Sequence, residues 1–428
     1  MHHGSGHLGK VRVMSALLAA AALSAGCGGS AVGPAENSNA DGSLPLAVAQ
    51  AKEAGAAVDP AIVAADNGFG LRLFQSLIGG TNGNVAISPI SVAMALQIVY
   101  NGAAGATQQA MAQTLQLGSL STAQLNSANA ALQASLVGPD PMVQITIANS
   151  LWMHLSNNPV LPSFTQTDET YYGATVGDLA GAPDNVNAWV AAETQGLITQ
   201  ILPSEPPTYY ALVKAVIANT IYFKGQWSAA FDANLTVSAP FTLSDGSQVS
   251  SDMMQRVGSY EYLQRTNFQA VRLPYGQGRF SMLIVLPDSG IDLGSFVAAM
   301  TADNLDGWIA QLQNSFGAVA LPRFTATYGE SLPAALTSLG MGIAFCPNPK
   351  ADFSGIAAFS CIADVEHKTV VEVDESGTVA TGATTVTVGT TVVQDPVFSM
   401  TMDRPFLYAI RDDMTGELLF IGILQNPN

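Results

Sequence analysis

The order of the secondary-structure signals constrains the fold more than any other feature of this sequence. Helical periodicity fills the first half of the chain, with apolar residues four apart at Phe69, Leu73 and Leu77. Strand patterns concentrate later, where the nearly continuous apolar run ALVKAVIANTIYF, residues 211–223, is typical of a central buried strand. Near the C-terminus, PFLYAIRD and LLFIGIL flank DMTGE, which predicts a hairpin. Helices followed by strands indicate an α+β domain rather than alternating βαβ units.

Two segments in the helical half carry their own start signals. In ISPISVAMALQIVYNG, Ser88 is placed to cap a helix whose first residue is Pro89. In APDNVNAWVAAETQGLITQIL, apolar residues recur on one helical face over 186–201, with Asp184 as the expected cap.

The composition is that of a globular protein with a large core. Of the 428 residues, 48% are hydrophobic and 11% are charged, which argues against general disorder. The net charge is −17 and the 15 basic residues form no cluster, so we expect no nucleic acid partner.

The N-terminal segment predicts export. Two basic residues precede VMSALLAAAALSAGC, a short apolar run that ends in small residues and Cys27, which indicates a signal peptide over residues 1–27. LSAGC resembles the lipobox of bacterial lipoproteins, which implies a lipid on Cys27 and an extracellular or outer-membrane-anchored bacterial protein; the alternative is plain secretion with Cys27 incidental. Residues 28–60, rich in Gly, Ala, Ser, Asn and Pro, are expected to be a flexible tether before a folded domain over 61–428.

Two cysteines remain in the domain, Cys346 and Cys361. In an oxidising compartment they can form a disulfide that closes a loop of about fifteen residues and contributes roughly 3 kcal/mol on the chain-entropy model. Two free buried thiols are the alternative. The spacing of Cys and His matches no zinc site, so we predict no metal and no cofactor.

The motifs of enzyme chemistry are missing from the sequence. Only His154 and His367 follow the signal segment, and no G-x-S-x-G elbow, GxxxxGK[ST] loop or HExxH helix occurs. Glu372 and Asp374 share a strand face and could form an acid pair, although a solvated strand end is the simpler interpretation. The chain is therefore predicted not to be an enzyme, with a hydrolase kept as the hypothesis from another class.

One segment near the C-terminus has an unusual composition. From Ser376 to Gln394 it has no charge and no proline, and almost every residue is Gly, Ala, Thr or Val. DESGTVATGATT resembles the hinge of the serpins, a family of protease inhibitors. Further serpin-like motifs follow the family's order from about Ile62 to Asn428: NVAISPISVAMAL, IANSLW, ANTIYFKGQW, PFTLSDGSQVSSDMM, LPYGQGRFSMLIVLP, LPRF, LTSLGM, ADFSGI, EHKTVVEVDESGT and DRPFLYAIRDDMTGELLFIGILQNP.

This resemblance implies the serpin fold, with three β-sheets, eight or nine helices and an exposed reactive-centre loop. It also implies a suicide-substrate inhibitor: a serine protease cleaves the loop and forms an acyl-enzyme, and the cut loop then inserts into the central sheet. Such an inhibitor acts as a monomer and forms a covalent complex. A non-inhibitory serpin that serves as a binding or structural module is the alternative.

The resemblance places the hinge at Glu375, Gly377, Thr378, Ala380, Gly382 and Thr384. Insertion makes demands that these residues meet, because an inserted strand must donate its N–H groups and therefore excludes proline. Alternate side chains become buried, so they must be small and uncharged. With Thr378 as the first inward residue, the next inward positions after it are all small or β-branched.

Counting from the hinge as the family does places the reactive bond between Thr391 and Val392, within a range from Thr390 to Gln394. No Lys or Arg occurs between Ser376 and Asp403, and no aromatic residue precedes Phe398 in that segment. Small β-branched residues suit elastase-like or subtilisin-like proteases rather than trypsin or chymotrypsin.

The resemblance also assigns structural switches. Ser88, Ser91, Asn219 and His367 match the hydrogen-bonded shutter beneath the sheet that opens, and Trp227 matches the aromatic residue where insertion starts. Residues 119–138 contain no Lys or Arg, so heparin activation is not expected.

Overall fold

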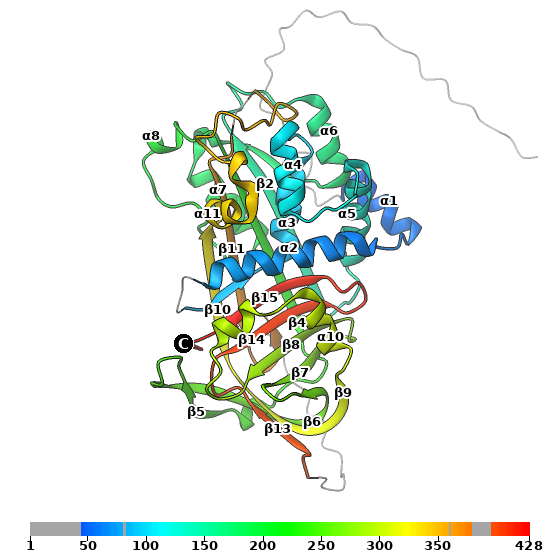
Figure 1. Cartoon of the computed structure of the whole chain (residues 1–428), viewed down its shortest axis with the longest axis vertical. Helices are drawn as coiled ribbons and strands as arrows, with labels where there is room; N and C mark the ends of the chain where they lie inside the picture. The colour runs from blue at the N-terminus through cyan, green and yellow to red at the C-terminus, as the bar shows by residue number, and fades with distance from the viewer. Residues whose placement is uncertain (1–43, 80–82, 359–360, 379–394) are drawn as a thin grey trace, which may run out of the picture.

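The computed structural model describes residues 44–79, 83–358, 361–378 and 395–428 (Figure 1). The predicted α+β class is correct. In the view of Figure 1, helices gather around the upper half of the molecule and strands β5 to β9 and β13 lie below helix α2. Within the described part of the chain, no helix is both long and apolar enough to cross a membrane.

The described residues form eleven α-helices, more than the eight or nine expected. Single-turn helices such as α8 and α11 carry no periodicity that a sequence pattern can reveal. The helices are α1 Leu46–Ala54, α2 Pro60–Ile78, α3 Pro89–Tyr100, α4 Gly105–Thr114, α5 Thr122–Leu136, α6 Pro162–Tyr171, α7 Asp184–Glu193, α8 Pro207–Tyr210, α9 Leu293–Ala298, α10 Ala302–Ile309 and α11 Pro333–Leu336.

Helix α1 corrects the predicted extent of the tether, because it lies inside residues 28–60. Its buried Val48 packs against Ala130 and Ala134 of α5, and Lys52 Nζ donates to the Val137 carbonyl at 2.9 Å. The Ala-rich composition that suggested a linker also has high helix propensity, and tertiary packing decides between the two.

Helix α3 is the central helix of the fold, and each of its residues is buried. Ser88 caps it and Pro89 is its first residue, as predicted, with the Ser88 hydroxyl accepting from the Ser91 N–H. The cap predicted for α7 was wrong: Asp184 is the first helical residue and Pro183 precedes it, so the carboxylate lies in the first turn.

A six-stranded sheet has the order β10-β11-β12-β4-β2-β3. Its strands are β2 Val143–Met153, β3 Thr175–Asp178, β4 Ala215–Gln226, β10 Phe324–Ser331, β11 Asp364–Val373 and β12 Gly377–Thr378. β4 has neighbours on both sides and is almost fully buried, as its apolar run predicted.

The other strands form one nine-stranded sheet, where the resemblance implied two separate sheets. Strand β6 is 17 residues long and pairs with β7 at one end and with β5 and β9 elsewhere, which joins the two halves. The strands are β1 Val85–Ile87, β5 Val237–Thr242, β6 Gln248–Gln264, β7 Phe268–Tyr275, β8 Phe280–Pro287, β9 Gln313–Pro322, β13 Phe398–Thr401, β14 Phe406–Asp412 and β15 Leu418–Leu424. The predicted hairpin is β14–β15.

Candidate functional site

Strand β12 enters the seam between β4 and β11. Gly377 and Thr378 pair with Gln226 and Gly225 of β4, and Thr378 also pairs with Val373 of β11. Farther along the seam, β4 and β11 pair directly with each other over residues 216–220 and 364–368. The seam therefore has a separated end, which we call the hinge end, and a closed end, which we call the shutter end.

Backbone geometry explains why glycine stands at position 377. Its φ is 154°, and a Cβ atom there would overlap the carbonyl oxygen of Gly225. Asp374 shapes the turn before it, because its Oδ1 accepts from the N–H groups of Ser376 (2.7 Å) and Gly377 (3.0 Å). Burial raises the pKa of Asp374, and these two backbone bonds oppose that change.

Aromatic side chains hold the hinge end from within. Thr378 is only 1% exposed, and its hydroxyl lies 2.6 Å from the hydroxyl of Tyr275. The Tyr275 ring stacks on Trp227 with centroids 4.4 Å apart. The Trp227 indole donates to the Asp374 carbonyl at 2.9 Å, and its backbone N–H donates to the Ser376 carbonyl at 2.9 Å. Trp227 therefore holds the turn by two hydrogen bonds and positions the Tyr275 ring that contacts Thr378.

An ion pair anchors the residue before the hinge glycine. Arg323 donates from Nε to Glu375 Oε2 at 2.8 Å and from Nη2 to Oε1 at 2.6 Å. The Thr236 hydroxyl donates to the same Oε1 at 2.5 Å. Burial raises the pKa of Glu375, but the bonds from Arg323 and Thr236 outweigh it, so the pKa lies below its usual value. The carboxylate is thus held ionised.

Four polar side chains meet at the shutter end. Asn219 of β4 lies opposite His367 of β11, and its Oδ1 is 2.8 Å from His367 Nδ1. Asn219 Nδ2 donates to the Ser91 hydroxyl at 2.7 Å and to Asn149 Oδ1 at 2.6 Å. The Ser88 N–H donates to His367 Nε2 at 3.1 Å. These bonds join both strands to the start of α3.

The contacts of His367 define its chemical form. Nε2 accepts from a backbone N–H, so the proton must be on Nδ1, which donates to Asn219 Oδ1. The ring is fully buried, and burial lowers its pKa to about 3. His367 is therefore a neutral hydrogen-bonding residue, and no carboxylate among the described residues bonds it as in a catalytic base.

The comparisons with known proteins agree with this geometry. The profile of the family described as Serpin (serine protease inhibitor) matches residues 64–427. The chain belongs to the serpin family. Serpins are protease inhibitors rather than enzymes, which agrees with the lack of enzyme motifs in the sequence.

Two curated relatives and one solved structure illustrate the match. Serpin B8 of Bos taurus is 34% identical over 356 residues, which cover 80% of this chain and 93% of the relative. The human leukocyte elastase inhibitor is 30% identical, over 85% of this chain and 98% of the relative. The native-state structure of the thermophilic serpin tengpin is 27% identical, with a TM-score of 0.79, over 86% of this chain and 95% of that one.

The structure brings together most of the residues that the sequence singled out in this serpin. Ser88, Ser91, Asn219 and His367 form one network, and Trp227 lies against the hinge. Six predicted residues lie outside the described part of the chain: Cys27, Ala380, Gly382, Thr384, Thr391 and Val392.

Two alternatives from the sequence are resolved by geometry. Cys346 and Cys361 are joined by a disulfide with Cα atoms 5.1 Å apart, rather than being free thiols. Glu372 is exposed, whereas Asp374 binds the turn, so the two do not form an acid pair. No group of three or more potential metal ligands occurs among the residues that the structure describes.

Three residues of this serpin's seam were not found by sequence reasoning. Arg323 pairs with the hinge, Tyr275 bonds Thr378, and Asn149 extends the shutter. Each lies more than 50 residues along the chain from its partner. No local pattern in the sequence could have paired them.

Proposed function

We propose that this serpin is a suicide-substrate inhibitor of an elastase-like or subtilisin-like serine protease. The protease attacks the reactive loop near Thr391–Val392 and forms an ester between its serine and the loop. The Thr391–Val392 peptide bond breaks and Val392 becomes a protonated N-terminus that leaves the protease active site, while the C-terminal segment stays in the fold through β13, β14 and β15. The loop on the other side of the bond then inserts into the six-stranded sheet before water hydrolyses the ester. The displaced protease then stays covalently bound.

The observation that supports this proposal is the position of β12. Its two residues already lie between β4 and β11, in the register that a longer inserted strand would use. Among the described residues, positions 221–224 of β4 have no strand partner on the β11 side. Loop residues 379–382 would pair there without breaking any existing ladder bond.

Farther insertion has a cost that can be located. Continuing the same register residue by residue places Thr384 opposite both Asn219 and His367. Loop residues 383–387 would therefore replace the direct pairing of β4 with β11, including the bond between those two side chains. A threonine hydroxyl both donates and accepts, so Thr384 can bond the groups that it separates.

The burial of Thr378 supports the predicted alternation. Because successive side chains of a strand point to opposite faces, Ala380, Gly382 and Thr384 would follow Thr378 into the interior. None of them is charged or large. A buried charge at these positions would cost several kcal/mol, which would delay insertion and favour hydrolysis of the ester.

The expected target class follows from the loop composition. The absence of Lys and Arg between Ser376 and Asp403 leaves a trypsin-like pocket without its anchor. Thr391 and its β-branched neighbours suit small apolar pockets. The relative named leukocyte elastase inhibitor is consistent with this class, although the identity with it is only 30%.

The test is incubation with elastase, subtilisin, trypsin and chymotrypsin at equimolar ratio. We expect an adduct with elastase or subtilisin that survives boiling in SDS, at a stoichiometry near one. Mass spectrometry of the released peptide then gives the reactive bond. Cleavage by all four enzymes without any adduct would instead establish the alternative, a non-inhibitory serpin, and trapping of trypsin but not elastase would refute the target class.

We also propose that the protein is exported and carries a lipid on Cys27. The disulfide between Cys346 and Cys361 supports export, because such bonds persist in oxidising compartments. Expression in a bacterium with labelled palmitate should label the wild type and leave Cys27→Ala unlabelled. Labelling of neither, with both proteins in the medium, would instead favour plain secretion.

We further propose that the inhibitor acts as a monomer without heparin. Helix α5 and its flanks, residues 119–138, contain no basic residue that would bind a sulfated polysaccharide. The rate of adduct formation should therefore be unchanged by heparin. An acceleration of tenfold or more would overturn this part of the proposal.

A further inference from the structure

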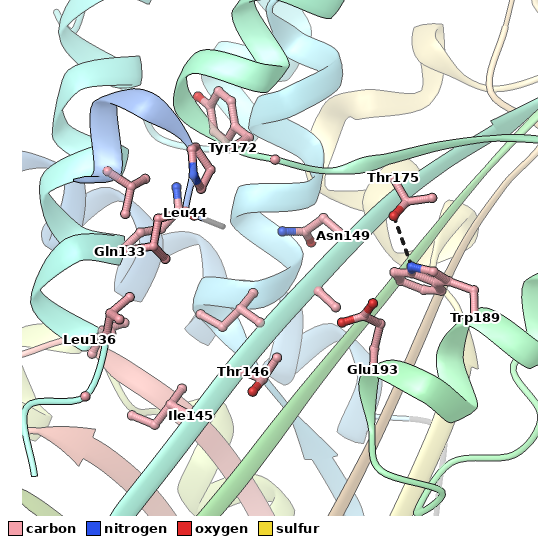
Figure 2. Close-up of a pocket in the computed structure, with 17 residues that line it drawn as sticks. Leu44, Gln133, Leu136, Ile145, Thr146, Asn149, Tyr172, Thr175, Trp189 and Glu193 are labelled. Carbon is pink, nitrogen blue, oxygen red and sulfur yellow. Dashed lines mark hydrogen bonds between the residues drawn. The ribbon is translucent and has the colours of Figure 1, made fainter. Parts of the chain in front are cut away.

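A cavity of about 650 Å³ lies beside the six-stranded sheet, away from the hinge (Figure 2). Strand β2 forms its floor over residues 145–149, the start of α1 and the end of α5 form one side, and α7 forms the other. This volume falls in the range of sites that bind small organic molecules.

The walls of the cavity combine apolar and polar side chains and contain one charge among the described residues. Leu136, Ile145, Ile147 and the Trp189 ring supply apolar surface, and Glu193 is the only charged side chain among the described residues that line it. Figure 2 shows the Glu193 side chain directed toward the cavity from α7.

Within the described residues, the Glu193 carboxylate has neither an ion pair nor a hydrogen-bond partner. Desolvation raises its pKa, as expected for a half-buried carboxylate without a cation beside it. A positive group placed against it would remove this penalty.

Trp189 is fixed one helical turn before Glu193 on the same face of α7. Its indole Nε1 donates to the Thr175 hydroxyl at 3.1 Å, and its ring packs edge-on against Trp152 with centroids 6.2 Å apart. An oriented indole beside a carboxylate is the combination that attracts organic cations, through the ring face and the opposite charge together.

We propose that this cavity binds an organic cation with an apolar body, whose charged group lies against Glu193 and Trp189 and whose apolar part packs on β2 and α5. The proposal does not rest on the inhibitory function: no described hinge residue lines the cavity, and Asn149 is the one lining residue that also belongs to the shutter network.

No basic side chain of the described residues lines the cavity beside Glu193. The segment before Leu44, residues 28–43, contains Glu36 and Asp41 but no Lys or Arg. Lys52 of α1 is engaged at the rim, where it donates to the Val137 carbonyl. Lys52 is thus the one basic residue between positions 28 and 52 and is already bonded, so we assign the complementary charge to a molecule outside the chain.

Three probes of one shape and different charge test the proposal: 4-phenylbutylamine, 4-phenylbutanol and 4-phenylbutanoate, titrated into the full chain by calorimetry. We expect the amine to bind at least tenfold more tightly than the alcohol, and the carboxylate not to bind. Glu193→Gln should reduce amine affinity about tenfold and leave the alcohol unchanged, since only the charge is lost. Glu169→Gln removes an equal charge from the exposed face of α6 and should change neither.

A second variant tests the location. Thr146→Trp would fill the space above β2 and should abolish binding of the amine and the alcohol. Equal affinity for all three probes, no binding by the amine, or full amine affinity in Glu193→Gln would each overturn the proposal. If Thr146→Trp does not fold, as judged by its melting curve, the charge comparison in Glu193→Gln decides alone.

Discussion

The two ends of the seam between β4 and β11 are built in opposite ways. At the hinge end the strands are already separated, and β12 is held by a partly exposed ion pair, stacked rings and turn bonds. At the shutter end the strands pair directly, and fully buried His367 and Asn219 bond to each other. At the hinge end β4 and β11 are therefore separated, whereas at the shutter end they are paired and held by a few buried polar groups.

If the loop inserts as proposed, this difference predicts where the barrier to insertion lies. Contacts at the hinge end can persist while the strand grows, because Gly377 and Thr378 already occupy their places in the ladder. Contacts at the shutter end must break before the strand reaches Thr384. Substitutions at the hinge should therefore change trapping most strongly, and substitutions at the shutter should mainly change the stability of the uncut protein.

The largest effect is expected for Thr378→Arg. An arginine would replace a buried side chain that contacts Tyr275, and a charge there cannot be desolvated without a partner. The variant should be cleaved as a substrate, with at least a tenfold loss of SDS-stable adduct on a gel. Thr325→Arg makes the same change at an exposed position of β10 and should keep trapping; equal trapping by both variants would contradict the hinge assignment.

Removal of the disulfide should come next. Cys346 and Cys361 close the loop that leads into the shutter end of β11, where the Ala363 N–H donates to the Ala215 carbonyl at 2.8 Å. The double change to serine should lower the free energy of unfolding by about 3 kcal/mol on the chain-entropy model. Urea titration of the uncut protein measures this, and reduction of the wild type should give a similar shift while the double variant stays unaffected by reductant.

His367→Leu tests the shutter end directly. The change leaves the Ser88 N–H and the Asn219 amide without their buried partner, which should cost about 2 kcal/mol of stability. Urea unfolding of the uncut protein should show this loss. His154→Leu, which removes one bond to the Tyr210 carbonyl away from the seam, is the matched control and should cost less. An unchanged urea midpoint in His367→Leu would show that the hydrogen bonds of His367 do not stabilise the shutter end of the uncut protein.

The smallest effect concerns Glu375 and depends on pH. Its folded-state pKa is lowered, so its contribution is present above the usual glutamate pKa and is lost as the pH falls through the lower folded value. Because Arg323 is partly exposed, Glu375→Gln should cost only about 1 kcal/mol at pH 7. The difference between the two proteins in urea should shrink as the pH falls below 4.5, and a difference at pH 3 as large as that at pH 7 would refute the ion-pair explanation.

The sequence predicted features that depend on local patterns. Ser88 was found as a cap because capping needs only neighbouring residues, and the inward position of Thr378 follows from the two-residue period of a strand. Helix α1 was missed because its Ala-rich segment gains its order from packing on α5. The contacts of Arg323 with Glu375 and of Tyr275 with Thr378 join residues far apart in the sequence, so no local pattern predicts them.

The family resemblance supplied what periodicity could not. It joined Ser91, Asn219 and His367 into one predicted network, although they are spread across the chain, and the structure places Asn219 within hydrogen-bond distance of both others. The family resemblance did not predict that β6 joins the two expected sheets into one. That joining depends on the length of a single strand.

The two residues of β12 have a kinetic consequence. Beginning a new strand is the slow stage of strand addition, since backbone freedom is lost before any ladder bond repays it. Here β12 is such a starting pair of residues: it is already in the ladder of the folded protein, where Trp227 and Tyr275 hold it by hydrogen bonds. On the proposed mechanism, only propagation of the strand would remain after cleavage, and the protein would not have to form the first ladder pair anew for each protease.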